Sequence, residues 1–114
     1  MDNPKRGEVS FEADGKTYKM HFSTNAICAL EEALDQDIGT LLDTMDGESP
    51  SMRVMRALFQ AGLSDNHPQV TVYDAGAIID EITLAKAGEL ISSAVEKSFL
   101  AAEAGSAKPG NRKR

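Results

Sequence analysis

The strongest local constraint in this chain is a pair of alternating apolar and polar segments joined by Asp14-Gly15. Asp-Gly is favoured in two-residue type I′ turns because both turn positions need a positive φ. A turn here places Phe11 opposite Tyr18, and side chains alternate between the two faces of a strand. The apolar face then holds Val9, Phe11, Tyr18, Met20 and Phe22, and the polar face holds Glu8, Ser10, Glu12, Thr17, Lys19 and His21. Because one register sorts both segments, the sequence predicts a β-hairpin over residues 7–22.

The rest of the chain carries helical periodicity. An isolated hairpin is barely stable in water, so its apolar face must pack on these helices. Apolar spacing predicts helices over about 26–34, 38–45, 50–63, from Thr71 to Ile82, and over 84–102. The expected N-caps are Ser23-Thr24-Asn25, Asp37, Ser49-Pro50, Thr71 and Thr83, with Thr71 and Asp74 forming a capping box. The third helix is expected to bury Met52, Met55, Leu58, Phe59 and Leu63 and to end near Gly62.

These elements predict an α+β, mostly α fold, with an N-terminal β-hairpin packed on a small assembly of four to five helices. A chain of 114 residues is one domain's worth of sequence. We expect a flexible N-terminus over 1–6 and a single domain over 7–102, made of the hairpin at 7–22 and a helical part at 23–102. Residues 103–114 are expected to form a disordered basic tail, because they offer no large apolar residue to a core.

The net charge of −6 is unevenly distributed. Residues 101–114 hold four basic residues and one acidic residue, a balance of +3, so the other hundred residues carry −9. Between Thr24 and Pro50 there are seven acidic residues and no Lys or Arg. An acidic body repels phosphates, so we do not expect nucleic-acid binding. The acidic stretch suits either a solvated surface or a basic partner, and the tail is either a solubilising end or a weak charge-based contact.

The sequence offers little for catalysis. His21 lies in a predicted strand and His67 in a loop, and neither has a ligand partner at a metal-binding spacing. Cys28 lies in a helix rich in Ala and Leu and is expected to be a small buried hydrophobe. The acids at 31–37 lack the spacing of a calcium loop, and Asp80-Glu81 suit an outer helix face. We therefore predict no enzyme, no cofactor, and no catalytic, cofactor-binding or metal-binding residue.

Methionines are the side chains that point most directly to a binding role. Met52 and Met55 share one predicted helix, and Met45 lies just before it. An exposed row of methionines would suit a peptide-binding groove, whereas core filling is the more ordinary use of methionine, and we favour core filling. The single cysteine excludes an internal disulfide framework and fits a reducing, intracellular setting. The first residues lack the apolar stretch of a secretory signal.

Several motifs, in order and spacing, resemble the gene-transfer-agent family of small phage-tail proteins. Its opening is matched by Gly7-Glu8-Val9, by Asp14-Gly15-Lys16-Thr17-Tyr18 and by the run from Phe22-Ser23-Thr24-Asn25 to Glu31-Glu32-Ala33-Leu34. Its second half is matched by Leu58-Phe59-Gln60-Ala61-Gly62-Leu63, by His67-Pro68 and by Ala75-Gly76-Ala77-Ile78-Ile79-Asp80-Glu81. The resemblance covers about residues 4–100 and leaves out the linker at 45–51 and the tail.

The resemblance implies a non-enzymatic tail assembly chaperone that binds and solubilises the long, helical tape-measure protein during tail assembly. The alternative is a structural tail-tube or tail-completion subunit, for which one hairpin supplies few strands. The implied partners are a tape-measure-like helical protein and tail-tube subunits, without a membrane. A homo-oligomer is compatible with the sequence. The implied setting is the cytoplasm of a bacterial host, with a phage or prophage origin. No partner-binding residue is predicted.

Overall fold

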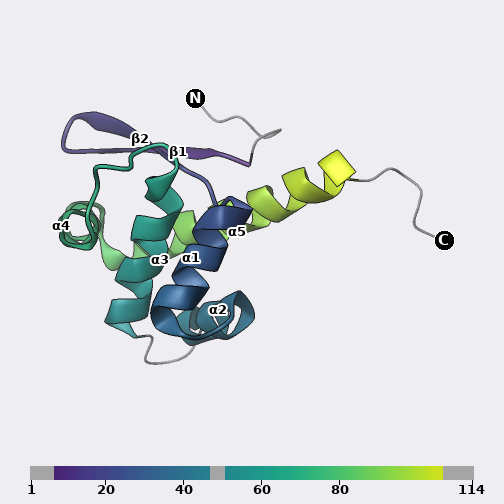
Figure 1. The fold of residues 1–114 in the computed structure, drawn as a ribbon. Helices are drawn as coiled ribbons and strands as arrows, with labels where there is room; N and C mark the ends of the chain where they lie inside the picture. Colours follow the sequence, from purple (N-terminus) through teal and green to yellow (C-terminus); the bar gives the residue numbers. More distant parts are fainter. Residues whose placement is uncertain (1–6, 47–50, 107–114) are drawn as a thin grey trace.

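The computed structural model describes residues 7–46 and 51–106, and their fold is α+β and mostly α, as predicted (Figure 1). A two-stranded antiparallel sheet precedes five helices. The elements are β1 (Val9–Ala13), β2 (Lys16–Met20), α1 (Thr24–Leu34), α2 (Ile38–Asp46), α3 (Met52–Ser64), α4 (Val72–Ile82) and α5 (Leu84–Ser106). None of the helices in the described ranges is both long enough and apolar enough to pass through a membrane.

The hairpin has the predicted register. Ala13 pairs with Lys16, and Asp14 and Gly15 have φ values of 52° and 75°, as a type I′ turn requires. The rings of Phe11 and Tyr18 stack across the strands with centroids 5.4 Å apart. Phe11 also contacts Phe59 of α3, so the apolar face of the hairpin covers that helix.

One residue assigned to the polar face of the hairpin is misplaced. Glu8 is only 5% exposed, although the alternation along the strand predicted a solvent-facing side chain. Gly7, beside it, has a φ of 72° and lies against α5 so closely that a Cβ would stand 2.6 Å from Ser98 Cα. The contact of Gly7 with α5 places the start of the hairpin in an interface with that helix. Glu8 is therefore covered there, although it belongs to the predicted polar face of the hairpin.

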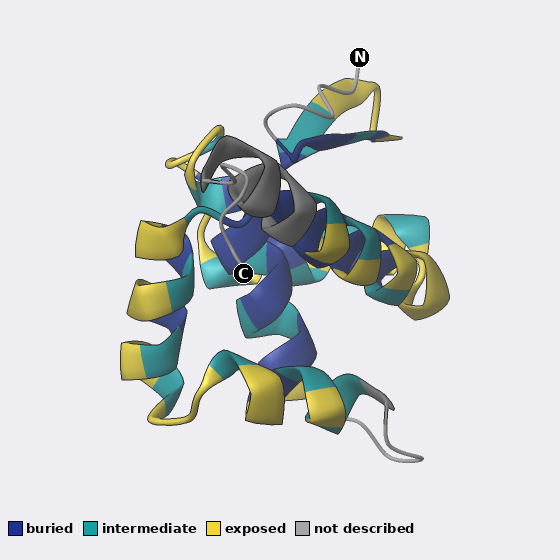
Figure 2. Ribbon diagram, turned by 90° about the vertical axis from the view of Figure 1, so that its right-hand side faces the viewer, coloured by how far each residue is buried: buried dark blue, intermediate teal, exposed yellow. Residues whose placement is uncertain are grey.

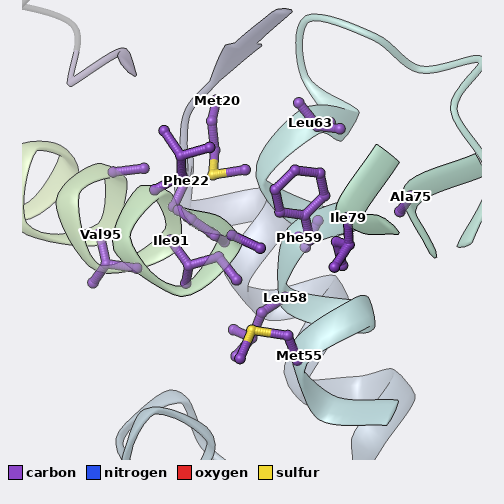
Figure 3. Packing of buried hydrophobic residues seen from close by; sticks show 14 of the residues in the cluster. Met20, Phe22, Met55, Leu58, Phe59, Leu63, Ala75, Ile79, Ile91 and Val95 are labelled. Atoms are coloured by element: carbon purple, nitrogen blue, oxygen red, sulfur yellow. The ribbon is translucent and has the colours of Figure 1, made fainter. Parts of the chain in front are cut away.

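Helix α3 is the centre of the core. It packs against α1, α2, α4, α5 and β2. Leu58, Phe59 and Leu63 are fully buried, and Figure 3 shows them among side chains from β2, α4 and α5. Figure 2 shows the same packing by burial: buried residues lie where helices face one another, and exposed residues lie on the outer sides of the helices. Burying large apolar side chains on one central helix is the main source of stability in a domain of this size.

The predicted role of Gly62 as a helix end is wrong. Helix α3 continues to Ser64, so Gly62 is helical. A Cβ at this position would lie 2.6 Å from Cγ of Met20 and 2.9 Å from Cζ of Phe22. The backbone N–H of His21 donates to the Gly62 carbonyl at 2.8 Å. Glycine therefore lets the hairpin approach α3 closely enough for backbone hydrogen bonding.

Most helix starts follow the predicted capping chemistry. The hydroxyls of Ser23 and Thr71 accept N–H groups of the first turns of α1 and α4, and Thr71 forms the predicted capping box with Asp74. For α3 the cap is Ser51, with its hydroxyl accepting the N–H of Val54, and the predicted Ser49-Pro50 start lies outside the described residues. These side chains satisfy N–H groups that have no partner inside the helix.

The last helix is longer than predicted. Helix α5 extends to Ser106, beyond the expected end near Ala102, so the first residues assigned to the basic tail are helical. The remainder of that tail, residues 107–114, and the N-terminal segment 1–6 lie outside the described residues.

Candidate functional site

The two histidines that the sequence offered for chemistry hold the hairpin in place. His67 follows α3, and its Nε2 accepts the backbone N–H of Lys19 at 3.0 Å. Its ring also meets Tyr18 edge-on, with centroids 5.1 Å apart. Burial lowers the pKa of His67, which favours the neutral imidazole that this acceptor role needs. His67 thus ties the α3–α4 connection to β2.

His21 belongs to a second polar junction, between the hairpin and α5. Its Nδ1 lies 3.4 Å from the Gly7 carbonyl and 3.4 Å from Ser98 Oγ. The buried Ser98 hydroxyl accepts the N–H of Phe22 at 3.1 Å and donates to the Gly7 carbonyl at 3.3 Å. Ser98 lies beside the apolar stripe of α5, but helical periodicity does not identify its partners, which come from the hairpin.

Cys28 is exposed, which overturns the prediction that it is buried. Ala26 and Leu30 are the buried residues of α1. Cys28 is two residues from each of them in the sequence, which places it about 200° around the helix, on the opposite face. The apolar composition of α1 hid this orientation. None of the hydrogen bonds or ring contacts of His21 and His67 given above includes Cys28. Within the described ranges, no group of three or more His, Cys, Asp and Glu residues could hold a metal ion.

Two acidic residues, one in the last turn of α1 and one just before α2, accept hydrogen bonds at the start of α2. Glu31 Oε2 accepts the N–H of Ile38 at 2.8 Å, and Asp37 Oδ1 accepts the N–H of Thr40 at 2.8 Å. The hydrogen bond from Thr40 lowers the pKa of Asp37. With Cys28, Glu32, Asp35 and Gln36, these two residues line a shallow depression of about 420 Å³. Asp80 and Glu81 are exposed, as predicted.

An open groove of about 600 Å³ lies between α3 and α4. Met55 and Ile79 are its buried residues, whereas Met52 is 58% exposed and Tyr73 is 77% exposed. The guanidinium carbon of Arg56 lies 5.4 Å from the centre of the Tyr73 ring, within range of a cation–π contact. The predicted burial of Met52 is wrong, because it occupies the first turn of α3, at the end remote from the hairpin.

Small residues of α4 shape this groove. Gly76 and Ala77 leave room beside α3, and a Cβ at Gly76 would stand 3.4 Å from Cδ of Arg56. The apolar stem of Arg56 can therefore lie along α4 while its charged end remains at the groove. Sequence periodicity found both helices but gave no sign of this pairing, because it depends on how they pack.

A second open groove, of about 710 Å³, lies between the end of α2, α3 and α5. Met45, Leu84 and Gly88 contribute to it, and Leu84 is 37% exposed. Met55 lines both grooves, so the first half of α3 has an open depression on each side. Glu89 and Glu96 give the second groove acidic edges.

These surfaces suit binding better than a reaction. Open grooves lined by methionine accept the apolar side chains of a partner helix, because methionine adapts its shape easily. The prediction of core-filling methionines is confirmed for Met20 and Met55, which are buried, and is wrong for Met52, which is exposed. Met45 is partly buried against the core. The candidate functional site is therefore the pair of grooves on either side of the first half of α3.

Comparison with known families gives one match. The family described as "Phage tail tube protein, GTA-gp10" matches residues 6–100, which include the hairpin and all five helices except the end of α5. No curated protein and no solved structure matches the chain. The family is one of structural phage-tail proteins. Its description names a tail-tube protein, which agrees better with the alternative expectation of a structural tail-tube subunit than with a tail assembly chaperone.

Proposed function

Because the chain belongs to the phage tail tube protein family GTA-gp10, we propose that it is a structural subunit of the tail tube of a phage or gene transfer agent. The observation that carries this proposal is the extent of the match, from residue 6 to residue 100. It spans both grooves beside α3 and nearly the whole described fold. In this role the protein acts by binding other tail proteins in the host cytoplasm, without a reaction.

The grooves support such a role physically. A subunit of an assembly must expose apolar surface that a neighbour can cover. Met52 and Tyr73 provide it at the α3–α4 groove, and Leu84 provides it at the α2–α3–α5 groove. Both grooves are open, so the side chains of a neighbouring protein can enter them without unfolding this chain.

A tail assembly chaperone is the second candidate, and the strand content favours it. The described residues form one two-stranded sheet, whereas tubes and barrels closed by hydrogen-bonded strands need more strands in each subunit. A chaperone of the tape-measure protein needs only a compact body and a groove for an amphipathic helix. The α2–α3–α5 groove has the volume and the apolar lining for that use.

Purified tails distinguish the two candidates. A tube subunit remains in finished tails in many copies, whereas a chaperone leaves before the tail is complete. Immunoblotting of purified particles, with a known tail protein as the standard, measures the copy number. Abundant chain in finished tails supports the tube subunit. Its absence overturns that role.

Co-expression with the tape-measure-like helical protein tests the chaperone. We expect a soluble complex with the unaltered chain, and loss of that complex with Leu84→Glu, which places a charge in the α2–α3–α5 groove. The exposed residue Thr17 in the hairpin gives the control Thr17→Glu, which should retain the complex. A partner that stays insoluble with the unaltered chain contradicts the chaperone role.

A further inference from the structure

We propose that the α3–α4 groove binds a second copy of this chain, through the acidic surface at the junction of α1 and α2. We call the first the basic groove, because it contains Arg53 and Arg56, and the second the acidic corner, comprising Glu31, Glu32, Asp35 and Asp37. The inference deepens the tail-tube proposal and rests on it only for the expectation that many copies meet.

The basic groove carries net positive charge, because two arginines and one aspartate line it. Arg53 and Arg56 are the two arginines within residues 7–46 and 51–106, and both line this groove. No carboxylate of the described residues forms an ion pair with either guanidinium, although Asp80 also lines the groove. Arg56 instead contacts the ring of Tyr73. Although the chain has a net negative charge, two arginines, which are always ionised, lie beside an apolar depression.

Apolar side chains at this groove are exposed and can be buried by a partner. Met52 and Tyr73 are large side chains with mostly apolar surface, and more than half of each is exposed to solvent. Surface ion pairs contribute little by themselves, so a stable contact also needs apolar area to be removed from water. The groove offers both, because the two arginines lie beside Met52 and Tyr73. Aromatic residues, Met and Arg are the types enriched at protein interfaces.

The acidic corner has the complementary charge. From Thr24 to Asp46, helices α1 and α2 contain no Lys or Arg. The carboxylates of Glu31 and Asp37 accept backbone N–H groups at the start of α2, which fixes their positions. Glu32 and Asp35 are exposed beside them. The corner therefore presents negative charge at the junction of α1 and α2, and its shallow depression of about 420 Å³ can receive a side chain of the neighbour.

The two surfaces lie on different sides of the molecule. Helices α1 and α4 both pack on α3, and Figure 1 places them on either side of it. The basic groove therefore cannot be covered by the acidic corner of its own chain. A contact between two unlike surfaces of identical copies is heterologous, and it propagates from copy to copy into a ring or a filament. This is the kind of contact that a repeated structure such as a tail tube requires.

Charge reversal of the full-length chain tests the contact by sedimentation velocity over a concentration series. We expect reversible self-association that weakens between low salt and roughly 0.5 M NaCl, because salt screens charges. Arg53→Glu with Arg56→Glu should raise the apparent Kd at least about tenfold. Glu32→Lys with Gln36→Lys should do the same, while leaving the helix-capping residues Glu31 and Asp37 unchanged.

Mixing the two variants identifies the occupant of the groove. The first variant reverses the charge of the arginines, and the second lowers the net charge of the acidic corner from −4 to −1, so each alone weakens the attraction. In the mixture, the unaltered groove of one variant can meet the unaltered corner of the other, and association should recover. Lys16→Glu with Lys86→Glu is the matched control, because it reverses two exposed charges outside both surfaces and should associate like the unaltered chain. Circular dichroism of each variant verifies that it is folded.

Three outcomes overturn the inference. They are a monomeric chain at every concentration, self-association that neither charge-reversed variant weakens, and a mixture that does not recover. In the first case, an acidic helix of another tail protein becomes the occupant of the groove. None of these outcomes decides whether the chain is present in purified tails, so the tail-tube proposal stands or fails separately.

Discussion

The two halves of α3 have similar apolar residues and opposite surroundings. In the second half, Leu58, Phe59 and Leu63 are fully buried, with the hairpin packed close to Gly62. In the first half, an open groove lies on each side of Met55, and Met52 is mostly exposed. The difference shows that the hairpin covers one end of the central helix and leaves open grooves at the other. The proposed binding role therefore assigns stability and partner binding to separate residues of one helix.

The largest test of this division compares one apolar residue from each half. Phe59→Ala should lower the free energy of unfolding by about 3–5 kcal/mol, because it removes a fully buried aromatic side chain and leaves a cavity. Met52→Ala should change it by no more than about 0.5 kcal/mol, because the side chain is mostly in solvent. Urea unfolding followed by circular dichroism measures both. Equal effects would refute the division.

The close approach at Gly62 gives the next largest effect. Gly62→Val should destabilise the protein by about 1–3 kcal/mol, because its side chain overlaps Met20 and Phe22 and pushes the hairpin from α3. Gly39→Ala is the control, since its Cβ meets only Asp37 Oδ1, at an ordinary 3.6 Å. Alanine there should stabilise α2 by no more than about 0.5 kcal/mol, because Gly39 is in the first turn and not in the helix interior. A Gly62→Val protein as stable as the unaltered chain would show that the hairpin contact is loose.

The Ser98 junction tests what holds the hairpin in place. Ser98→Ala removes the acceptor of the Phe22 N–H in a buried site, so we expect a loss of about 1–3 kcal/mol. Ser92→Ala, on an exposed position of the same helix, should stay within about 0.5 kcal/mol. Hydrogen exchange of the Phe22 amide adds a local readout, because this amide should exchange faster only in Ser98→Ala. Unchanged exchange would mean that another group accepts this bond.

The smallest effect is the pH dependence contributed by His67. Burial makes its pKa lower in the folded chain than the ordinary value of 6.5, so the unfolded chain binds more protons in this range. The stability from His67 is therefore complete above about pH 6.5 and is lost as the pH falls through the lower, folded pKa. Urea midpoints at about pH 7.5 and 5.5 measure this loss. In His67→Asn the difference between the two midpoints should shrink, and an unchanged difference would assign it to other groups.

Local patterns in the sequence were sufficient for the elements and for the family. The hairpin register follows from Asp14-Gly15 and the alternation around it, because turn geometry and strand pleating act over a few residues. The capping box of Thr71 and Asp74 is equally local. The order of these motifs resembled a phage-tail family, and the family match over residues 6–100 confirms that resemblance.

Burial, and with it the candidate site, was decided by tertiary packing. Helix α1 is apolar around much of its circumference, so its periodicity did not show that Cys28 faces solvent. Met52 and Met55 share a helix, yet only the placement of α4 and α5 leaves one exposed and the other beneath two grooves.

The same distinction explains Gly62 and Arg56. Their importance lies in contacts with Met20 and Tyr73, which are far away along the chain. Turn, cap and strand preferences arise from neighbouring residues and can be read from the sequence. Side-chain burial depends on how whole helices pack against one another, and this chain's grooves exist only once α3, α4 and α5 are assembled.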